Sequence, residues 1–321
     1  MSDPNFLRAL DEVLSRLAAA RDKEGNPLNL HEIVVSNRTG MRSVPLNSSA
    51  IRVDLRSISK PVLGFLFGAL LELPEAQRSG LTFEASVWPF FEKELVLENV
   101  GNLDKLRDLK VSHLLNSTLG HQDGIMFRKD IGDRPEETLL NYSFNYPLDH
   151  VPGTHFVYSN AGAFILSALI SRVFERTADD LAREIIFAPL EIEQIYWRHF
   201  GSDCAGCTGL KLNASEMNQI GRAIVGGMPN EAVPLAWRIS MLDSFYPTPT
   251  MVDEKRALPK RGYGHFLWKS RDGHCYTDGT DGQYLIICGD RDTVISVTGQ
   301  QPDMKPIGEA LRPLLENATQ H

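Results

Sequence analysis

Leucine residues near the start of the chain recur at helical spacing. They occupy Leu7, Leu10, Leu14 and Leu17, so they share one face of a helix. We expect a helix over about residues 5–20 that packs on a sheet through this apolar face.

Strand signals follow this helix. Two stretches with strand signals, 31–36 and 41–46, flank a turn sequence at 37–40, which is typical of a hairpin. A short strand at 50–53 then leads to Ser57 and the apolar run 62–71. We expect a helix that begins close to Ser57, because Pro61 is tolerated only in a first helical turn.

Between residues 79 and 200 the hydrophobic spacing is mostly helical. Two intervening segments, 120–124 and 141–152, carry loop residues, and we expect them to line a cleft. The predicted helices are 83–95, 112–116, 161–176 and 179–189.

The last third of the chain returns to strand patterns. A strand at 210–212 precedes a helix start in which Asn213 and Glu216 form a capping box. Phe266 and Trp268 alternate with their neighbours on a predicted strand, so one face of that strand is core. Four consecutive antiparallel strands are predicted at 262–270, 274–278, 283–288 and 293–298, and a helix at 304–318 closes the chain.

This order of elements predicts an α+β fold, with an antiparallel sheet flanked by the N- and C-terminal helices and an inserted all-helical lobe. We expect residues 1–321 to form a single domain. Its α/β lobe comprises about 1–78 and 201–321, and its helical lobe about 79–200.

Composition and charge restrict the partners. The chain has 321 residues, of which 42% are hydrophobic, and a net charge of −8. This predicts a soluble globular protein whose main partner is neither nucleic acid nor an anionic membrane. The N-terminus lacks the features of a signal peptide, and the run 62–71 is too short to span a bilayer, so we expect a cytoplasmic location. Nothing in the sequence specifies an oligomeric state.

Candidate metal ligands are sparse. Cys204 and Cys207 have Cys-x-x-Cys spacing, but no second pair of cysteines or histidines completes a zinc set, so we interpret them as structural. The acidic pair Asp130 and Asp133 lacks further ligands. We expect no metal and no other cofactor. The cysteines are too few and too scattered for a disulfide framework: Cys204, Cys207, Cys275 and Cys288.

Ser57 and Lys60 lie three residues apart, on one face of the first turn of the predicted helix. A serine hydroxyl attacks a carbonyl usefully only when a neighbour removes its proton, and a lysine amine does so once burial or another cation lowers its pKa. The free N–H groups of a helix start can hold the resulting oxyanion. Taken alone, the pair also fits an ordinary helix cap followed by a lysine.

A second polar segment, 152–162, contains Tyr158 and Asn160 and precedes a predicted helix. Alone it fits a polar helix cap. Beside a Ser/Lys pair, however, the Tyr158 hydroxyl can relay a proton to the leaving group, and the Asn160 amide can hold substrate and lysine by hydrogen bonds. His121 and His155 lie near these segments, and we interpret them as structural rather than substrate-contacting.

With its motifs in this order, the sequence resembles the serine β-lactamase and penicillin-binding-protein superfamily, most closely the class C β-lactamase-like esterases and peptidases. The resemblance covers nearly the whole chain and implies an active site in a cleft between the sheet and the helical lobe. It rests on Ser57-Ile58-Ser59-Lys60, 111–115 with Gly120, 152–160, Gly262-Tyr263-Gly264 and the glycine-bearing segment 277–283.

The resemblance also implies roles for individual residues. Ser57 becomes acylated, Lys60 accepts its proton, and Tyr158 passes that proton to the leaving group and later activates water. Asn160 positions the substrate. The oxyanion is held by the backbone N–H of Ser57 and by a second N–H from the strand edge that follows the third motif.

The third motif departs from the family pattern. Relatives usually carry Lys-Thr-Gly or His-x-Gly, whose basic first residue helps hold a substrate carboxylate, whereas here Thr-Asp-Gly occurs twice, at 277–279 and 280–282. In the first register, which we prefer, Gly279 precedes the second oxyanion donor, Thr280. In the second register, Gln283 is that donor.

Asp278 and Asp281 therefore place negative charge where relatives have a cation. Two like charges a few ångströms apart repel by roughly 1 kcal/mol or more. We predict a neutral ester or amide as substrate, with an amine that meets Asp278 or Asp281 as one possibility. Alternatively, both carboxylates point away from the cleft or cap the turn between two strands.

The sequence thus predicts a serine hydrolase that acts on a small ester or amide through a covalent acyl-enzyme on Ser57. The same residues also serve an acyltransferase, in which a bound alcohol or amine replaces water. A catalytically silent homologue that binds a ligand or partner in the cleft is the alternative from a different class, and loss of the basic third-motif residue favours it.

Overall fold

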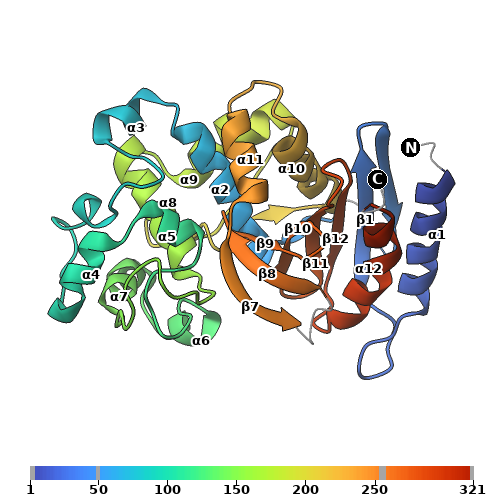
Figure 1. Ribbon diagram of the computed structural model, residues 1–321, viewed down its shortest axis with the longest axis horizontal. Helices are drawn as coiled ribbons and strands as arrows, with labels where there is room; N and C mark the ends of the chain where they lie inside the picture. Colours follow the sequence, from blue (N-terminus) through green and yellow to red (C-terminus); the bar gives the residue numbers. More distant parts are fainter. Residues whose placement is uncertain (1–3, 48–50, 253–257, 319–321) are drawn as a thin grey trace.

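The computed structural model describes residues 4–47, 51–252 and 258–318, and the centre of this part is an eight-stranded sheet (Figure 1). The strand order is β2-β1-β12-β11-β10-β9-β8-β7, and all neighbouring strands are antiparallel. The strands are β1 (Leu30–Asn37), β2 (Gly40–Pro45), β7 (Tyr246–Val252), β8 (Pro259–Gly264), β9 (Leu267–Lys269), β10 (Cys275–Gly279), β11 (Gln283–Ile287) and β12 (Val294–Gly299).

Helices cover both faces of this sheet. The terminal helices α1 (Pro4–Ala19) and α12 (Lys305–Asn317) lie side by side at its β1 end (Figure 1). Helix α10 (Ala214–Gly226) packs on β1, β11 and β12, where Gly221 adjoins the side chains of Val294 and Leu285. Its start carries the predicted capping box between Asn213 and Glu216. The α+β class and the flanking terminal helices are therefore confirmed.

The segment that carries Ser57 begins at the edge of a small strand pair. Strand β3 (Val53–Asp54) pairs with β6 (Lys211–Leu212), and the 3-10 turn η1 (Arg56–Ile58) leads directly into α2 (Ser59–Leu70). Every residue of α2 is buried, as expected of a helix that is apolar on all sides. The predicted helix start near Ser57 is correct. The predicted strand at 50–53 lies partly outside the described residues.

The regular elements of residues 79–200 are mainly helices, and this stretch contributes no strand to the eight-stranded sheet. The helices α4 to α9 gather on the side of the molecule opposite α1 and α12 (Figure 1). The division into two lobes stays a prediction. The helical elements are α3 (Pro74–Ser79), η2 (Trp88–Phe90), η3 (Val100–Asn102), α4 (Leu103–Asp108), α5 (Val111–Leu115), α6 (Arg128–Ile131), η4 (Glu136–Thr138), α7 (Leu139–Asn145), α8 (Ala161–Phe174), α9 (Ala178–Ala182), η5 (Arg183–Phe187) and η6 (Ala188–Leu190), followed by the short pair β4 (His199–Phe200) and β5 (Asp203–Cys204).

The predicted helix at 83–95 is wrong. Its first residues form a turn and an isolated bridge, and they bond to the start of α5 and the residues before it: Val87 N donates to the Leu109 carbonyl and Ser112 N to the Phe83 carbonyl. The only helical turn in this stretch is η2, which contains Pro89. The predicted helix at 179–189 is divided among α9, the π-helical turn η5 and η6, which contains Pro189 and so has one backbone donor fewer.

The predicted strand at 262–270 is a hairpin of two strands, β8 and β9. His265 and Phe266 form its turn, with φ of +51° and +64°, the left-handed values that a two-residue hairpin turn requires. Phe266 therefore does not share a strand face with Trp268, as the predicted single strand required. The Phe266 N–H donates to the Leu115 carbonyl at 3.0 Å and ties the turn to α5.

The elements that were not predicted include α11 (Leu235–Asp243) and β7, besides several short helices and strands between residues 74 and 204. Strand β7 contains Pro247 and Pro249, which is compatible with its place at the edge of the sheet. Among the helices of residues 4–47, 51–252 and 258–318, none is both long and apolar enough for a membrane crossing.

Candidate active site

Lys60 connects three segments that are distant in sequence. Its Nζ donates to Ser57 Oγ at 2.9 Å, to the Tyr158 hydroxyl at 3.1 Å and to the Cys207 carbonyl at 3.3 Å. Lys60 is completely buried, whereas Ser57 and Tyr158 are half-buried. The structure thus brings together the three predicted catalytic side chains. Their arrangement is able to move a proton from the serine hydroxyl to the amine, and a proton from the Tyr158 hydroxyl to a leaving group.

The turn that carries Ser57 is held by Asp54. One carboxylate oxygen of Asp54 accepts from the backbone N–H groups of Arg56, at 2.8 Å, and of Gly209, at 3.2 Å. In addition, Leu210 N donates to Ser59 Oγ at 3.2 Å. Because these bonds fasten segment 207–210 to the start of α2, the Cys207 carbonyl lies within reach of Lys60.

Tyr158 lies in the loop before α8, among aromatic rings. The rings of Phe127 and Trp268 stack on it at centroid distances of 6.4 and 5.4 Å, and Tyr263 meets it edge-on at 5.5 Å. Burial holds the pKa of Tyr263 well above its usual value, and the proximity of Tyr158 and Asp278 acts in the same direction, so Tyr263 is a neutral phenol. The Tyr158 ring therefore packs against uncharged aromatic side chains.

Asn160 holds a neighbouring loop. Its Nδ2 donates to the Met126 carbonyl at 2.9 Å, and its backbone N–H donates to the Ile125 carbonyl at 3.1 Å. The Asn160 side-chain oxygen is buried and accepts no hydrogen bond within the described part of the chain. The amide group is thus adjacent to the Tyr158 segment, with one acceptor unused.

The third motif passes directly against the serine turn. Gly279, the last residue of β10, lies so close that an added Cβ would overlap the Leu55 carbonyl oxygen and lie 3.1 Å from Arg56 Cβ. The second glycine, Gly282, instead adjoins Gln301 and has a φ of +96°. The glycine of the first register is therefore the one that faces the Ser57 segment. Thr280, next in the chain, is exposed.

The remaining third-motif side chains are engaged or buried. Asp281 Oδ2 accepts from the Arg56 guanidinium at 3.1 Å, and Gln283 Nε2 donates to the Gly299 carbonyl at 2.9 Å. Asp278 is only 2% exposed and lies close enough to Tyr263 to influence its pKa. The Arg56–Asp281 ion pair was not predicted, and no local pattern signals it, because its residues are 225 positions apart.

The other candidate residues lie apart from Lys60 or are chemically inert. Burial raises the pKa of the Cys207 thiol to about 11 and that of Cys204 further, so both are uncharged thiols at neutral pH. His121 is buried against Tyr146, while the half-buried His155 stacks on His150. The Asp130 carboxylate accepts from Phe127 N. Within the described ranges, no cluster of three or more His, Cys, Asp or Glu residues is arranged to hold a metal ion.

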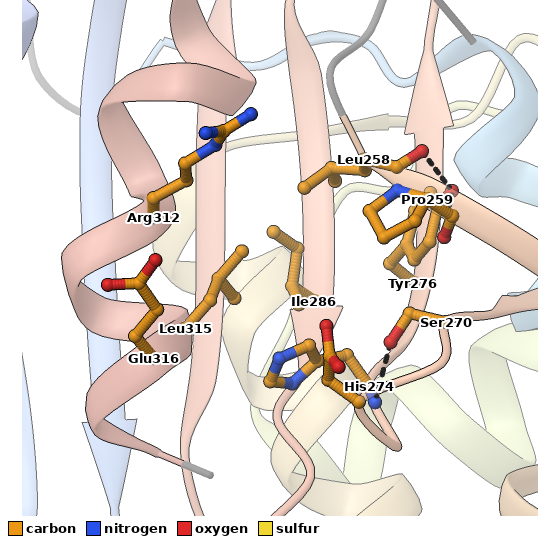
Figure 2. Close-up of a pocket in the computed structure, with 10 residues that line it drawn as sticks. Leu258, Pro259, Ser270, His274, Tyr276, Ile286, Arg312, Leu315 and Glu316 are labelled. Carbon is orange, nitrogen blue, oxygen red and sulfur yellow. Dashed lines mark hydrogen bonds between the residues drawn. The ribbon is translucent and has the colours of Figure 1, made fainter. Parts of the chain in front are cut away.

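A second serine–histidine combination lies elsewhere and lacks catalytic geometry. A cavity of about 370 Å³ between α12 and the sheet contains Ser270 and His274 (Figure 2). The Ser270 hydroxyl accepts from the backbone N–H of His274, not from its ring, and the ring Nδ1 accepts from Gly289 N at 2.9 Å. The imidazole is therefore not placed to deprotonate Ser270.

The comparisons with known proteins agree with this geometry. A sequence profile of the Beta-lactamase family matches residues 48–319. The solved structure described as "EstCE1, a hydrolase with promiscuous acyltransferase activity" has a TM-score of 0.72 and 13% identity, and the match covers 98% of this chain and 99% of that chain.

Two further solved structures are similar in fold. A class C β-lactamase mutant has a TM-score of 0.71 and 13% identity, over 99% of each chain. An octameric penicillin-binding protein homologue from Pyrococcus abyssi has a TM-score of 0.71 and 15% identity, over 99% of this chain and 78% of that chain. Since the family profile spans most of the sequence, the protein belongs to the Beta-lactamase family and is a serine hydrolase.

Proposed function

We propose that this protein hydrolyses small neutral esters or amides through a covalent acyl-enzyme on Ser57. The observation that carries the proposal is the position of the buried Lys60 amine, 2.9 Å from the Ser57 hydroxyl and 3.1 Å from the Tyr158 hydroxyl. A nucleophile within hydrogen-bond distance of its base, beside a second proton carrier, is the arrangement that acyl transfer requires.

In the acylation step, the Ser57 oxygen forms a bond to the substrate carbonyl carbon while its proton passes to Lys60. The carbonyl oxygen becomes an oxyanion that accepts from the backbone N–H groups of Ser57 and Thr280. The close approach of Gly279 to the serine turn supports this pairing of donors and the first register of the motif. The carbon–leaving-group bond then breaks, and Tyr158 supplies the proton that the departing oxygen or nitrogen needs.

Deacylation repeats these steps with water. Tyr158 and Lys60 take a proton from water, whose oxygen bonds to the acyl carbon. The tetrahedral intermediate then expels the Ser57 oxygen, which takes a proton back from Lys60, and a carboxylic acid is released. Asn160 has an unused amide oxygen beside the Tyr158 segment, and we propose that this oxygen accepts a polar N–H or O–H of the substrate.

The charges around the site support a neutral substrate. Asp281 is already paired with Arg56, and Asp278 is buried beside Tyr263, so neither carboxylate is free to meet a substrate amine. This arrangement favours the alternative in which both carboxylates are turned away from substrate. The aromatic rings around Tyr158 favour an apolar or aromatic group next to the scissile bond.

The test is covalent labelling and turnover. The wild-type protein is incubated with a fluorophosphonate probe and with a panel of aryl esters, anilides and β-lactams, and its intact mass is measured. We expect an adduct on Ser57 and faster turnover of aryl esters than of β-lactams. Ser57→Ala should abolish both labelling and turnover, whereas Ser171→Ala, in the last turn of α8, should abolish neither. An unlabelled wild-type protein would support the catalytically silent binding protein instead.

An acyltransferase is the second candidate, since one protein of similar fold is described as having promiscuous acyltransferase activity. In this reaction a bound alcohol or amine, rather than water, attacks the acyl carbon. Adding a series of alcohols and amines to the ester assay separates the two functions. Transfer predominates if the acylated acceptor forms in preference to the free acid at acceptor concentrations far below that of water.

A further inference from the structure

Arg56 lies between two carboxylates, directly before the proposed nucleophile. Its guanidinium donates to Asp54 Oδ2 at 2.9 Å and to Asp281 Oδ2 at 3.1 Å. The three side chains are 27–36% exposed, so the network lies at the surface of the site rather than in its core. It joins the turn that carries Ser57 to the turn that carries Thr280.

Both ends of the Arg56–Asp281 bridge have unusual backbone conformations. Arg56 has a φ of +53° and Asp281 a φ of +81°, in the left-handed region that side chains other than glycine seldom adopt. Such conformations persist where surrounding contacts hold them, and they concentrate at functional sites. Here each strained residue adjoins one of the two proposed oxyanion donors, because Arg56 precedes Ser57 and Asp281 follows Thr280.

The far side of the 280–282 turn has its own anchor. Gln301 N donates to the Asp281 carbonyl at 2.8 Å, and Gly282 lies against Gln301. On the side facing Ser57, the Arg56 guanidinium is the side-chain group that holds Asp281. The ion pair is therefore placed to set the distance between the two turns.

We infer that the Arg56–Asp281 ion pair is a positioning device, which fixes the Thr280 N–H relative to the Ser57 N–H and so sets the width of the oxyanion site. The inference rests on the proposed function. Arg56 acts through these donors and need not touch the substrate. The ion pair also explains why an aspartate is compatible with the turn that follows the third motif, since its carboxylate binds the serine turn.

The charges predict an order of effects. Asp281→Asn removes one half of the bridge and leaves the Arg56–Asp54 pair intact. Arg56→Met leaves Asp54 and Asp281 together without a cation, beside the position where negative charge develops, and should therefore lower kcat further than Asp281→Asn does. Arg56→Lys retains the charge but lacks the planar guanidinium that binds two carboxylates at once, so its kcat should lie between those of Arg56→Met and the wild type.

The experiment measures kcat and KM for an aryl ester in each variant. Complete loss of an oxyanion donor lowers kcat about 100- to 1,000-fold, so a donor that is displaced rather than lost should cost about tenfold. We expect Asp281→Asn to lower kcat about tenfold with KM nearly unchanged. The double variant of Arg56→Met and Asp281→Asn should lose no more than Arg56→Met alone, because the two residues act as one pair.

Two further measurements separate positioning from general stability. Raising the salt concentration to 1 M should lower kcat in the wild type but not in Asp281→Asn, because salt screens a half-exposed ion pair that the variant lacks. Asp104→Asn removes the surface pair with Arg107, at 3.2 Å and far from Ser57, and should match the wild type in both kcat and salt response.

Failure of this inference is distinct from failure of the proposed function. If the wild type turns over esters through Ser57 while Asp281→Asn retains wild-type kcat and salt response, only the positioning role is overturned. If the wild type is neither labelled nor active, the proposed function and this inference both fall. If Asp281→Asn folds poorly, the salt dependence of the wild type decides the question, and a kcat that does not change with salt overturns the inference.

Discussion

Gly279 offers a direct test of how the third motif meets the nucleophile. An alanine at this position would place Cβ on the Leu55 carbonyl oxygen, 2.9 Å from Gln283 Oε1 and 3.1 Å from Arg56 Cβ. The Gln283 side chain can move away, but the Leu55 carbonyl belongs to the backbone and cannot move without displacing the serine turn. The end of β10 must therefore move away from η1.

The size of this movement sets the expected loss. Restoring an ordinary carbon–oxygen contact requires a shift on the order of 1 Å, and a misplacement of that size near the reacting atoms can cost about 100-fold in rate. We expect Gly279→Ala to lower kcat for an aryl ester by about that factor. Overpacking should lower the free energy of unfolding by about 1–3 kcal/mol, so the protein still folds.

The assay pairs steady-state kinetics with urea unfolding. Gly226→Ala is the matched control, because an added Cβ there meets no atom within 4 Å and alanine is the better residue in a helix. Gly282→Ala distinguishes the two registers of the motif. Its φ of +96° means that alanine lowers the free energy of unfolding, but the residue lies against Gln301 rather than η1, so the first register predicts a smaller loss of kcat than for Gly279→Ala. A folded Gly279→Ala variant with wild-type kcat, alongside an inactive Gly282→Ala, would refute the first register.

Three further outcomes follow from the geometry and the titration behaviour. Tyr158→Phe keeps the stacking on Trp268 but removes the hydroxyl 3.1 Å from Lys60, so kcat should fall by about 100-fold or more while the melting temperature changes little, as thermal unfolding and ester kinetics will show. Burial lowers the pKa of His121 from 6.5 to about 4, so unfolding takes up a proton between these pH values. The free energy of unfolding of the wild type therefore falls as the pH drops through that window. His121→Gln should reduce this fall by about 3 kcal/mol, measured by urea unfolding at pH 7 and at pH 4. Because burial raises the pKa of Cys207 to about 11, a thiol-specific disulfide reagent at pH 8 should leave Cys207 unmodified in the native protein and modify it after unfolding. Rapid modification of Cys207 in the native protein would contradict its interpretation as a structural residue.

Features encoded over a few neighbouring residues were predictable from the sequence. The leucine spacing predicted α1, the turn sequence at 37–40 predicted the β1–β2 hairpin, and Pro61 limited where α2 begins. Each of these signals depends on backbone geometry within one or two turns of chain. The same holds for Ser57 and Lys60, whose three-residue spacing places their side chains 2.9 Å apart.

The errors occur where tertiary pairing overrides the local pattern. Residues 83–87 have apolar spacing that suits a helix, but hydrogen bonds to 109–112 hold them in a turn and an isolated bridge. His265 and Phe266 interrupt an apparent single strand, because the chain reverses there and bonds to α5. Strand β7 was missed because its two prolines are unfavourable in most strands, and only its position at the edge of the sheet permits them.

The convergence of Tyr158 on Lys60, 98 positions away, has no local signal. The order of motifs implied it, and the structure provides its geometry. The Arg56–Asp281 pair could be predicted neither from local spacing, because its residues are 225 positions apart, nor from the order of motifs, because no motif contains it. Site residues that act through other residues are therefore the ones that a single sequence is least able to reveal.

The same pair clarifies what replaced the missing cation of the third motif. Arg56 brings a positive charge close to Gly279, and at first sight it compensates for the basic residue that relatives carry there. However, its guanidinium is shared between Asp54 and Asp281, so the three groups together carry a net charge of −1. A substrate carboxylate that approached this cluster would have to displace one of two carboxylates already bound, and would meet the repulsion of the other. The cation at this edge therefore binds the protein's own turns, and these already paired charges support the proposed preference for neutral acyl groups.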